Sequence, residues 1–244
     1  MRRPHDFIIF PLDVPDFDLA MKYVKKLKEH VGLFKVGLEL FIRQGPDILK
    51  AIHEIAGSKI FLDLKFHDIP ATVTRAFIAA ASFSPEFITV HCDSGENALR
   101  SAAEKYNGRT KLLAVTLLTS MNRDSLSRLG YREEYLHNIP ALVLSRAEMA
   151  KDAGCQGVVC SGHEVSFIKA RLGNSIIAVT PGIRPSWSLV NGDDQKRVIT
   201  PQTAVKNGAD YIVIGRPIRD ARDPVDAANR VAEEIESGLR EKTS

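Results

Sequence analysis

The sequence predicts an α/β fold, a (β/α)8 TIM barrel, on three observations. The chain has 244 residues, close to the typical size of this barrel. Strand-like and helix-like segments alternate along its whole length, and the strand-like segments number eight. They are short and apolar on both faces, as parallel strands covered on both sides are. The predicted strands are Phe7–Leu12, Leu33–Val36, Lys59–Leu64, Phe87–His91, Lys111–Leu117, Gly157–Cys160, Ile176–Thr180 and Tyr211–Ile214.

Helical patterns lie between these strands. The clearest are the amphipathic stretch Asp18–His30, the Ala-rich stretch Thr72–Ser82 and the charged stretch Val225–Leu239. Capping residues or prolines mark helix starts at 15–16, 46–47, 94–96 and 223–224. A doubly wound sheet is the alternative, but it does not require eight repeats. No Pro/Ser-rich linker divides the chain, so residues 1–244 are predicted to form one domain.

Composition and charge indicate an ordinary globular protein, and a small anionic substrate suits this charge better than a polynucleotide does. Hydrophobic residues make up 44% and charged residues 26%, a balance that argues against disorder. The net charge of +3 is spread along the chain, whereas nucleic-acid binders gather Lys and Arg on one face. One short lysine cluster, at 22–28, falls around an amphipathic helix and is interpreted as a solvated face. We therefore expect no nucleic-acid partner.

The cysteines and the apolar runs indicate the cellular location of the protein. Cys92, Cys155 and Cys160 are odd in number and have neither disulfide nor zinc spacing, so free thiols in a reducing cytoplasm are expected. No signal-peptide pattern follows the N-terminal MRRPHDFIIF. No apolar run approaches the ~20 residues that a membrane-spanning helix needs. The sequence predicts a cytoplasmic protein with no membrane contact.

Two long irregular stretches are predicted at Thr119–Tyr135 and Ile183–Val198. Both follow predicted strands directly, so they belong to the carboxyl end of the barrel, where barrel enzymes build their sites. The second has the length and polarity expected of a lid over a substrate.

Charged residues end three successive predicted strands. Asp63 and Lys65 point to the same side of the third strand because side chains alternate, and Asp68 follows in the loop. Lys35 ends the second strand and Asp13 ends the first. Each of them alone is also compatible with a structural ion pair. Together, on one rim of a barrel, they favour a polar active site.

The end of the last strand suggests a phosphate site. Gly215 offers a backbone amide without a Cβ beside the guanidinium of Arg216, and Gln195 precedes them in the second long loop. Barrels often hold phosphate after the seventh and eighth strands. Gly215 alone could mark only a tight turn, but with its two neighbours the phosphate interpretation is favoured.

These motifs carry a resemblance that spans nearly the whole chain. The run Asp63-x-Lys65-x-x-Asp68-Ile69-Pro70, with Lys35 and Asp13 before it, resembles the orotidine 5′-phosphate decarboxylase family. The match continues in order through Leu118-Thr119-Ser120, Val159-Cys160-Ser161, Thr180-Pro181-Gly182-Ile183-Arg184-Pro185, Gly192-Asp193-Asp194-Gln195 and Ile214-Gly215-Arg216-Pro217. Ala71 is a small departure, because many relatives have a polar residue there; it leaves the charged array intact. The Asp-x-Lys-x-x-Asp run alone would be weaker, since related barrels acting on sugar phosphates also carry it.

The resemblance implies conversion of orotidine 5′-phosphate to uridine 5′-phosphate, the last step of de novo UMP biosynthesis, without cofactor or metal. It implies a catalytic array of Lys35, Asp63, Lys65 and Asp68, with Asp68 reaching in from the other subunit of a homodimer. Lys65 would donate the proton to the carbon that loses carbon dioxide. The resemblance also implies contacts to each part of the substrate. The ribose would be contacted by Asp13 and Lys35, and by Thr72 of the partner subunit, and the pyrimidine by Thr119 and Ser120. The phosphate would be bound by Gln195, Gly215 and Arg216, with Arg184 nearby, and further contacts would come from Asp63, Ile69 and Pro181.

The chemistry expected here is electrostatic. Losing carbon dioxide leaves an electron pair on a carbon that has no π-system to accept it, and most decarboxylases use a cofactor as the electron sink. No Gly-rich dinucleotide fingerprint and no cluster of His ligands is present in the sequence. Asp63 would lie near the departing carboxylate, and Lys65 would stabilise and then protonate the carbanion.

Two alternatives are weighed against this function. Sugar-phosphate decarboxylases and synthases on the same barrel use a divalent metal and have a carboxylate where Lys35 stands, so Lys35 argues against them. A non-catalytic nucleotide-binding barrel would not need the complete charged array. His67 lies within the array in sequence, but alternation points its side chain away from Lys65, so a structural or solvated role is predicted.

Overall fold

A computed structural model describes residues 2–188 and 199–243 and contains a closed barrel of parallel strands in the order β1 to β8. Each strand pairs with the next, and β8 pairs with β1. All eight predicted strands and the TIM-barrel fold are confirmed, with small shifts at the strand ends. The strands are β1 Ile8–Pro11, β2 Leu33–Gly37, β3 Ile60–Phe66, β4 Phe87–His91, β5 Lys111–Val115, β6 Gly157–Val159, β7 Ile177–Thr180 and β8 Tyr211–Val213.

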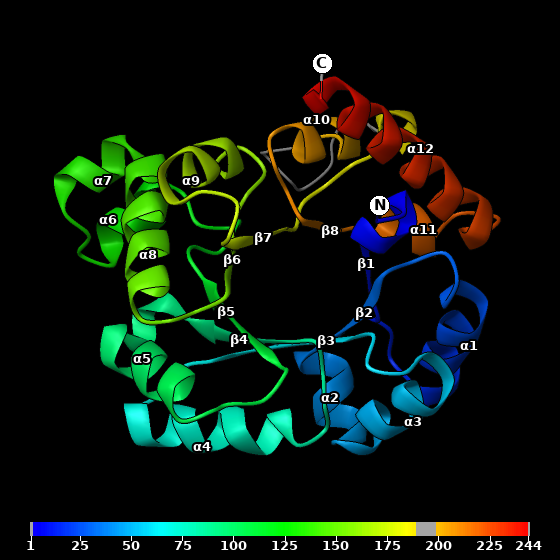
Figure 1. Ribbon diagram of the computed structural model, residues 1–244, viewed down its shortest axis with the longest axis horizontal. Coiled ribbons are helices and arrows are strands. Elements are labelled where there is room, and N and C mark those ends of the chain that lie inside the picture. Colours follow the sequence, from blue (N-terminus) through cyan, green and yellow to red (C-terminus); the bar gives the residue numbers. More distant parts are fainter. Residues whose placement is uncertain (1, 189–198, 244) are drawn as a thin grey trace.

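Helices surround the barrel as an outer ring (Figure 1). The α-helices are α1 Phe17–Leu27, α2 Leu38–Gln44, α3 Asp47–Ala56, α4 Pro70–Ala81, α5 Glu96–Glu104, α6 Arg123–Arg128, α7 Glu133–His137, α8 Ile139–Asp152, α9 Val165–Leu172, α10 Pro201–Lys206, α11 Arg216–Arg219 and α12 Pro224–Thr243; short 3-10 helices are η1 Pro4–Phe7, η2 Cys92–Ser94 and η3 Ser186–Ser188. The predicted helix starts are confirmed. Asp16, for example, caps α1 by accepting a hydrogen bond from the Leu19 amide at 2.8 Å.

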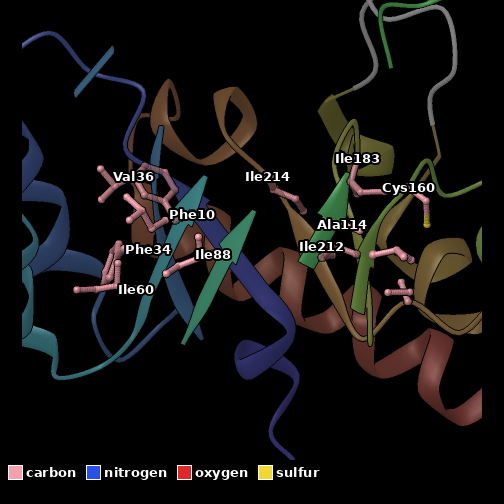
Figure 2. Close-up of a cluster of buried hydrophobic side chains, with 14 of the residues drawn as sticks. Phe10, Phe34, Val36, Ile60, Ile88, Ala114, Cys160, Ile183, Ile212 and Ile214 are labelled. Atoms are coloured by element: carbon pink, nitrogen blue, oxygen red, sulfur yellow. The ribbon is translucent and has the colours of Figure 1, made fainter. Parts of the chain in front are cut away.

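The core has two apolar layers, because successive strand residues face opposite sides. The outer layer lies between the strands and the helices; Figure 2 shows part of it, including Phe10, Phe34 and Ile60 on three neighbouring strands. The inner layer fills the barrel. The rings of Phe87 on β4 and Tyr211 on β8 lie 5.0 Å apart although these strands do not pair, so they meet across the interior. The barrel is packed, and open space is left at its mouth.

The amino ends of the strands are closed by the start of the chain. The Arg2 guanidinium lies over the rings of Phe7 and Tyr211, at 4.1 and 3.9 Å from their centroids. It also donates a 2.8 Å hydrogen bond to the Asp210 carbonyl. This end of the barrel is therefore sealed, and access to the interior is from the carboxyl ends of the strands.

One loop prediction needs correction and another lies partly outside the described residues. The stretch 119–135 is not irregular throughout: it contains α6 and the start of α7. Asn122 caps α6 by accepting from the Ser125 amide at 2.9 Å, a local signal that the sequence reading missed. In the stretch 183–198, the structure describes residues 183–188, and the rest of the predicted lid lies outside the described residues. None of the helices in the described part of the chain combines the length and apolarity that a membrane crossing requires.

Candidate active site

A cavity of about 430 Å³ opens at the carboxyl ends of the strands. This volume lies in the range of small-molecule sites, and the location is where barrel enzymes place their chemistry. Most of the predicted site residues line it. They are Asp13, Lys35, Asp63, Lys65, Thr119, Pro181, Arg184, Gly215 and Arg216.

Four charged side chains along one wall form a chain of alternating sign. The Lys35 ammonium lies 3.0 Å from Asp13 Oδ1 and 3.8 Å from Asp63 Oδ2. The Lys65 ammonium lies 2.8 Å from the same Asp63 oxygen. Asp63 and Lys35 are only 11% and 12% exposed, whereas Asp13 is 54% exposed at the edge. The inner charges are thus largely removed from water, where they act on one another and on a ligand more strongly than surface charges do.

The backbone of β3 is irregular where it presents these charges. β3 and β4 pair regularly at Leu62 with Ile88, but the next pair is Phe66 with Val90, so β3 has extra residues in between. Lys65, inside this bulge, has a φ of +50°. A non-glycine residue in this left-handed region is strained by roughly 1–2 kcal/mol and is held there by its surroundings. Asp63 and Lys65 share a side as predicted, but the reason includes this bulge as well as regular alternation.

The other end of the cavity is cationic. Arg216 and Arg184 line it, and Arg184 is buried. Gly215 packs so tightly against β1 that a Cβ added there would lie 2.9 Å from Pro11 Cγ. The glycine therefore allows β8 to continue into Arg216 at this position. The cavity thus has arginines at one end and the charged wall around Lys65 at the other.

Several predicted site residues do not line the cavity of their own chain. Asp68 is exposed in the loop after β3 and accepts a hydrogen bond from the Ile69 amide at 2.7 Å; Ile69 is exposed as well. Thr72 is partly buried in the first turn of α4, and Ser120 is exposed beside Thr119. Gln195 lies outside the described residues. His67 is exposed and does not line the cavity, as predicted.

Comparison with known proteins identifies the family of this site. A model of the orotidine 5'-phosphate decarboxylase / HUMPS family matches residues 6–231. The chain belongs to this family. It is 50% identical to the orotidine 5'-phosphate decarboxylase of Desulfosudis oleivorans, over 98% of this chain and 96% of that protein. The decarboxylase of Syntrophus aciditrophicus is 46% identical, with 95% and 94% coverage.

A solved structure agrees with the sequence comparisons. The crystal structure of orotidine 5'-phosphate decarboxylase from Lactobacillus acidophilus superimposes with a TM-score of 0.80 at 37% identity, covering 93% of this chain and 98% of that one. The match covers nearly the full length of both chains, so the whole barrel, and not only a motif, is shared with this decarboxylase family.

Within this family site, three residues escaped the sequence reading. Thr89 on β4 accepts a hydrogen bond from the Lys65 backbone amide and donates one to Asp63. Arg219 lines the cavity and donates to the Asp13 carbonyl at 3.2 Å. A Cβ at Gly37 would lie 3.0 Å from Lys35 Nζ, so the absence of a side chain makes room for the ammonium. Gly37 could have been suspected from the sequence because it lies two residues after Lys35. Thr89 and Arg219 could be assigned to the site only from the three-dimensional structure.

A buried arginine holds the loop that carries Thr119. Arg146 on α8 donates to the Thr116 carbonyl, the Asp93 carboxylate and the Tyr131 hydroxyl. Burial alone would raise the pKa of Asp93, but the hydrogen bond from His91 and the charge of Arg146 hold it below its ordinary value. This network joins the loops after β4 and β5 to α8, so the loop that carries Thr119 has a fixed base.

The three cysteines are free, buried thiols, and Cys160 lines the cavity. Burial raises the pKa of all three, that of Cys92 to about 12. They are therefore neutral at physiological pH and are poor nucleophiles. Among residues 2–188 and 199–243, no group of three or more His, Cys, Asp or Glu side chains is arranged to hold a metal ion.

Proposed function

We propose that the chain removes carbon dioxide from orotidine 5′-phosphate to give uridine 5′-phosphate, the last step of de novo UMP biosynthesis. The family match and the relatives that carry this name over nearly the full chain support a carboxy-lyase of this specificity. The observation that carries the proposal is the run of alternating charges Asp13, Lys35, Asp63 and Lys65 on one wall of the cavity. A substrate with a phosphate at one end and a carboxylate at the other would place its phosphate against the arginines and its carboxylate at the charged wall.

In the proposed reaction the two ends of the cavity have separate tasks. The phosphate is bound by Arg216 and the Gly215 amide, with Arg184 beside them. Gln195, which lies outside the described residues, is a further phosphate ligand in this proposal. Thr119 and Ser120 contact the pyrimidine, and Asp13 and Lys35 contact the ribose hydroxyls. Binding energy from the distant phosphate orders the reacting end, where only interactions that strengthen in the transition state raise kcat.

At the reacting end, Asp63 lies beside the substrate carboxylate and Lys65 beside the carbon that carries it. The bond between that carbon and the carboxylate breaks, carbon dioxide leaves neutral, and the electron pair stays on the ring carbon. The like-charge contact with Asp63 is relieved as carbon dioxide forms. The Lys65 ammonium stabilises the carbanion and then gives it a proton. Charges fixed before the reaction stabilise the transition state without reorganising.

Lys35 distinguishes this function from metal-dependent chemistry on the same barrel. Its ammonium lies 3.0 Å from Asp13 and 3.8 Å from Asp63, between the two carboxylates that a divalent cation would use. A dication at this point would meet a positive charge at contact distance. The chain's own residues therefore supply the cation that related metal-using barrels obtain from solution.

We also propose a homodimer in which Asp68 and Thr72 complete the site of the partner subunit. Asp68 is exposed and does not line its own cavity, which supports a role outside its own chain. Leu38 and Ile42 on α2 and Ile69 before α4 follow two neighbouring strands and are exposed apolar side chains. A second copy covering them would remove this apolar surface from water.

Two further expectations remain proposals. Strands from β1 to β8 close one barrel, which supports a single domain over residues 1–244. Three buried free thiols support a reducing, cytoplasmic location.

The test of the function is a direct assay. Purified protein without added cofactor, in excess chelator, is mixed with orotidine 5′-phosphate, and the loss of its ultraviolet absorbance is followed. We expect full activity under these conditions. Absence of turnover, or turnover abolished by chelator and restored by a divalent metal, would overturn the proposed function in favour of one of the two alternatives.

A further inference from the structure

Thr89 is a buried polar side chain directly beneath the charged wall. It lies in the middle of β4 and is fully buried. Its inward-facing neighbour along the strand, Phe87, belongs to the apolar inner layer. A hydroxyl at such a depth costs free energy unless it is hydrogen-bonded, so its partners decide why it is there.

Both partners of Thr89 belong to the charged array. Its Oγ1 accepts a hydrogen bond from the backbone N–H of Lys65 at 2.9 Å. It lies 3.0 Å from Asp63 Oδ1, to which it donates. A hydroxyl has one proton, and an amide can only donate, so the direction of this relay is fixed: Lys65 amide to Thr89 to Asp63 carboxylate. The other oxygen of Asp63 receives the two ammonium groups.

The contact to the Lys65 amide compensates for the irregular pairing of β3. The bulge between Leu62 and Phe66 separates this stretch from the regular ladder with β4, so the Lys65 amide bonds to the Thr89 side chain of β4. Lys65 is also held at a φ of +50°, a conformation that its surroundings must impose. One hydroxyl thus fixes the direction of the Asp63 carboxylate and the backbone from which the Lys65 side chain leaves.

We propose that Thr89 is a positioning residue for the decarboxylation: its hydroxyl sets the relative placement of Asp63 and Lys65. The inference rests on the proposed function for its effect on turnover. Thr89 does not line the cavity, so it acts through these two residues and not on the substrate. Its loss therefore affects kcat, whereas substrate binding, which depends on the distant phosphate end, changes little.

The test compares Thr89→Val, which keeps the shape and removes the hydroxyl, with Thr89→Ser, which keeps the hydroxyl. A misplacement of about 1 Å in an active site lowers turnover by about 10²-fold, so we expect kcat to fall by roughly 10- to 100-fold in the valine variant. We expect KM to stay within about threefold, as for a residue that makes no ground-state contact, and the serine variant to recover most of kcat. Should the valine variant not fold, Thr89→Ala carries the same prediction.

A matched control separates positioning from stability. Thr110, just before β5 at the closed end of the barrel, is also buried and donates one hydrogen bond, to the Pro85 carbonyl at 2.7 Å. Thr110→Val should lower the melting temperature as Thr89→Val does but leave kcat unchanged. A valine variant at 89 with normal kcat, a serine variant as impaired as the valine variant, or equal loss of kcat at position 110 would overturn the inference.

A second readout does not depend on catalysis. Amide hydrogen exchange at Lys65, followed by NMR, should be slow in the parent and in Thr89→Ser and clearly faster in Thr89→Val, because the acceptor of that amide is removed. Unchanged protection in the valine variant would refute the role of Thr89 even if kcat fell. An inactive parent protein would refute the proposed function alone, and the exchange measurement would still decide on Thr89.

Discussion

Replacing Lys65 by Met should nearly abolish turnover while the fold survives. The ammonium lies 2.8 Å from Asp63 Oδ2. At an effective dielectric constant of ~20 this attraction is worth ~6 kcal/mol, and in water only ~1.5 kcal/mol. The Lys65 side chain is 31% exposed, so the pair lies between these limits. Its deletion also removes the cost of partly burying the ammonium.

The net loss of stability should therefore be no more than about 2 kcal/mol, or roughly 4–8 °C in Tm for a chain of this size. The loss of activity should be much larger. A positioned proton donor contributes ~10²–10⁴-fold, and charge stabilisation of the transition state contributes a further ~10²–10³-fold. We expect kcat to fall by at least about 10⁴-fold, the lower limit of these two effects combined.

The assay measures kcat from the loss of substrate absorbance and Tm from circular dichroism on the same preparations. Lys111→Met is the matched control, because Lys111 on β5 is also paired with a carboxylate, that of Glu86, but at the closed end of the barrel. It should lose similar stability and keep its kcat. A Lys65→Met protein that melts within the stated range and retains kcat within tenfold of the parent would remove Lys65 from the mechanism.

Three further predictions concern other parts of the molecule. Arg216→Ala should raise KM and lower kcat/KM more than kcat, by about 10- to 100-fold for a lost charge-assisted hydrogen bond; an unchanged KM would argue against the phosphate assignment. Mixing inactive Asp68→Ala with inactive Lys65→Ala protein should restore about a quarter of the parent activity, because half of a random dimer population then has one intact site, and no recovery would place Asp68 outside the partner's site. The buried thiols, with the pKa of Cys92 raised to about 12, should resist a thiol reagent at pH 8 in the folded protein and react at once in urea; rapid labelling of the folded chain would contradict their burial.

The parts of the fold that depend on local pattern could be predicted from the sequence. Continuous apolar runs identified every strand, and Asp16 identified the start of α1. The charged rim was also predictable, because Asp13, Lys35 and Asp63 each stand near or just beyond the carboxyl end of a predicted strand, and such ends share one rim of a parallel barrel. Alternation then placed Asp63 and Lys65 on the same side.

The parts that depend on register and on distant contacts could not be predicted. Thr89 belongs to the site only because the pairing of β3 with β4 slips by two residues, and no local pattern announces this slip. Arg146 lies far in sequence from Asp93, and their contact follows from the packing of α8 against the barrel. The short helices α6 and α7 were missed because two turns or fewer give little periodicity to detect.

The barrel is closed by the pairing of β1 with β8, the junction between the two ends of the chain. β1 can pair with β8 only after almost the whole chain has been arranged around the axis, and closing so long a loop carries a large entropic cost. Residues from both ends of the chain gather at this junction: Arg2 binds the Asp210 carbonyl, and Asn229 on α12 accepts from His5 or His30, at 2.9 and 3.1 Å. We expect this junction to form late in folding. Since Gly215 and Arg216 come shortly after β8, a molecule whose junction has opened would lose the end of the cavity that these two residues line before the charges around Asp63 separate.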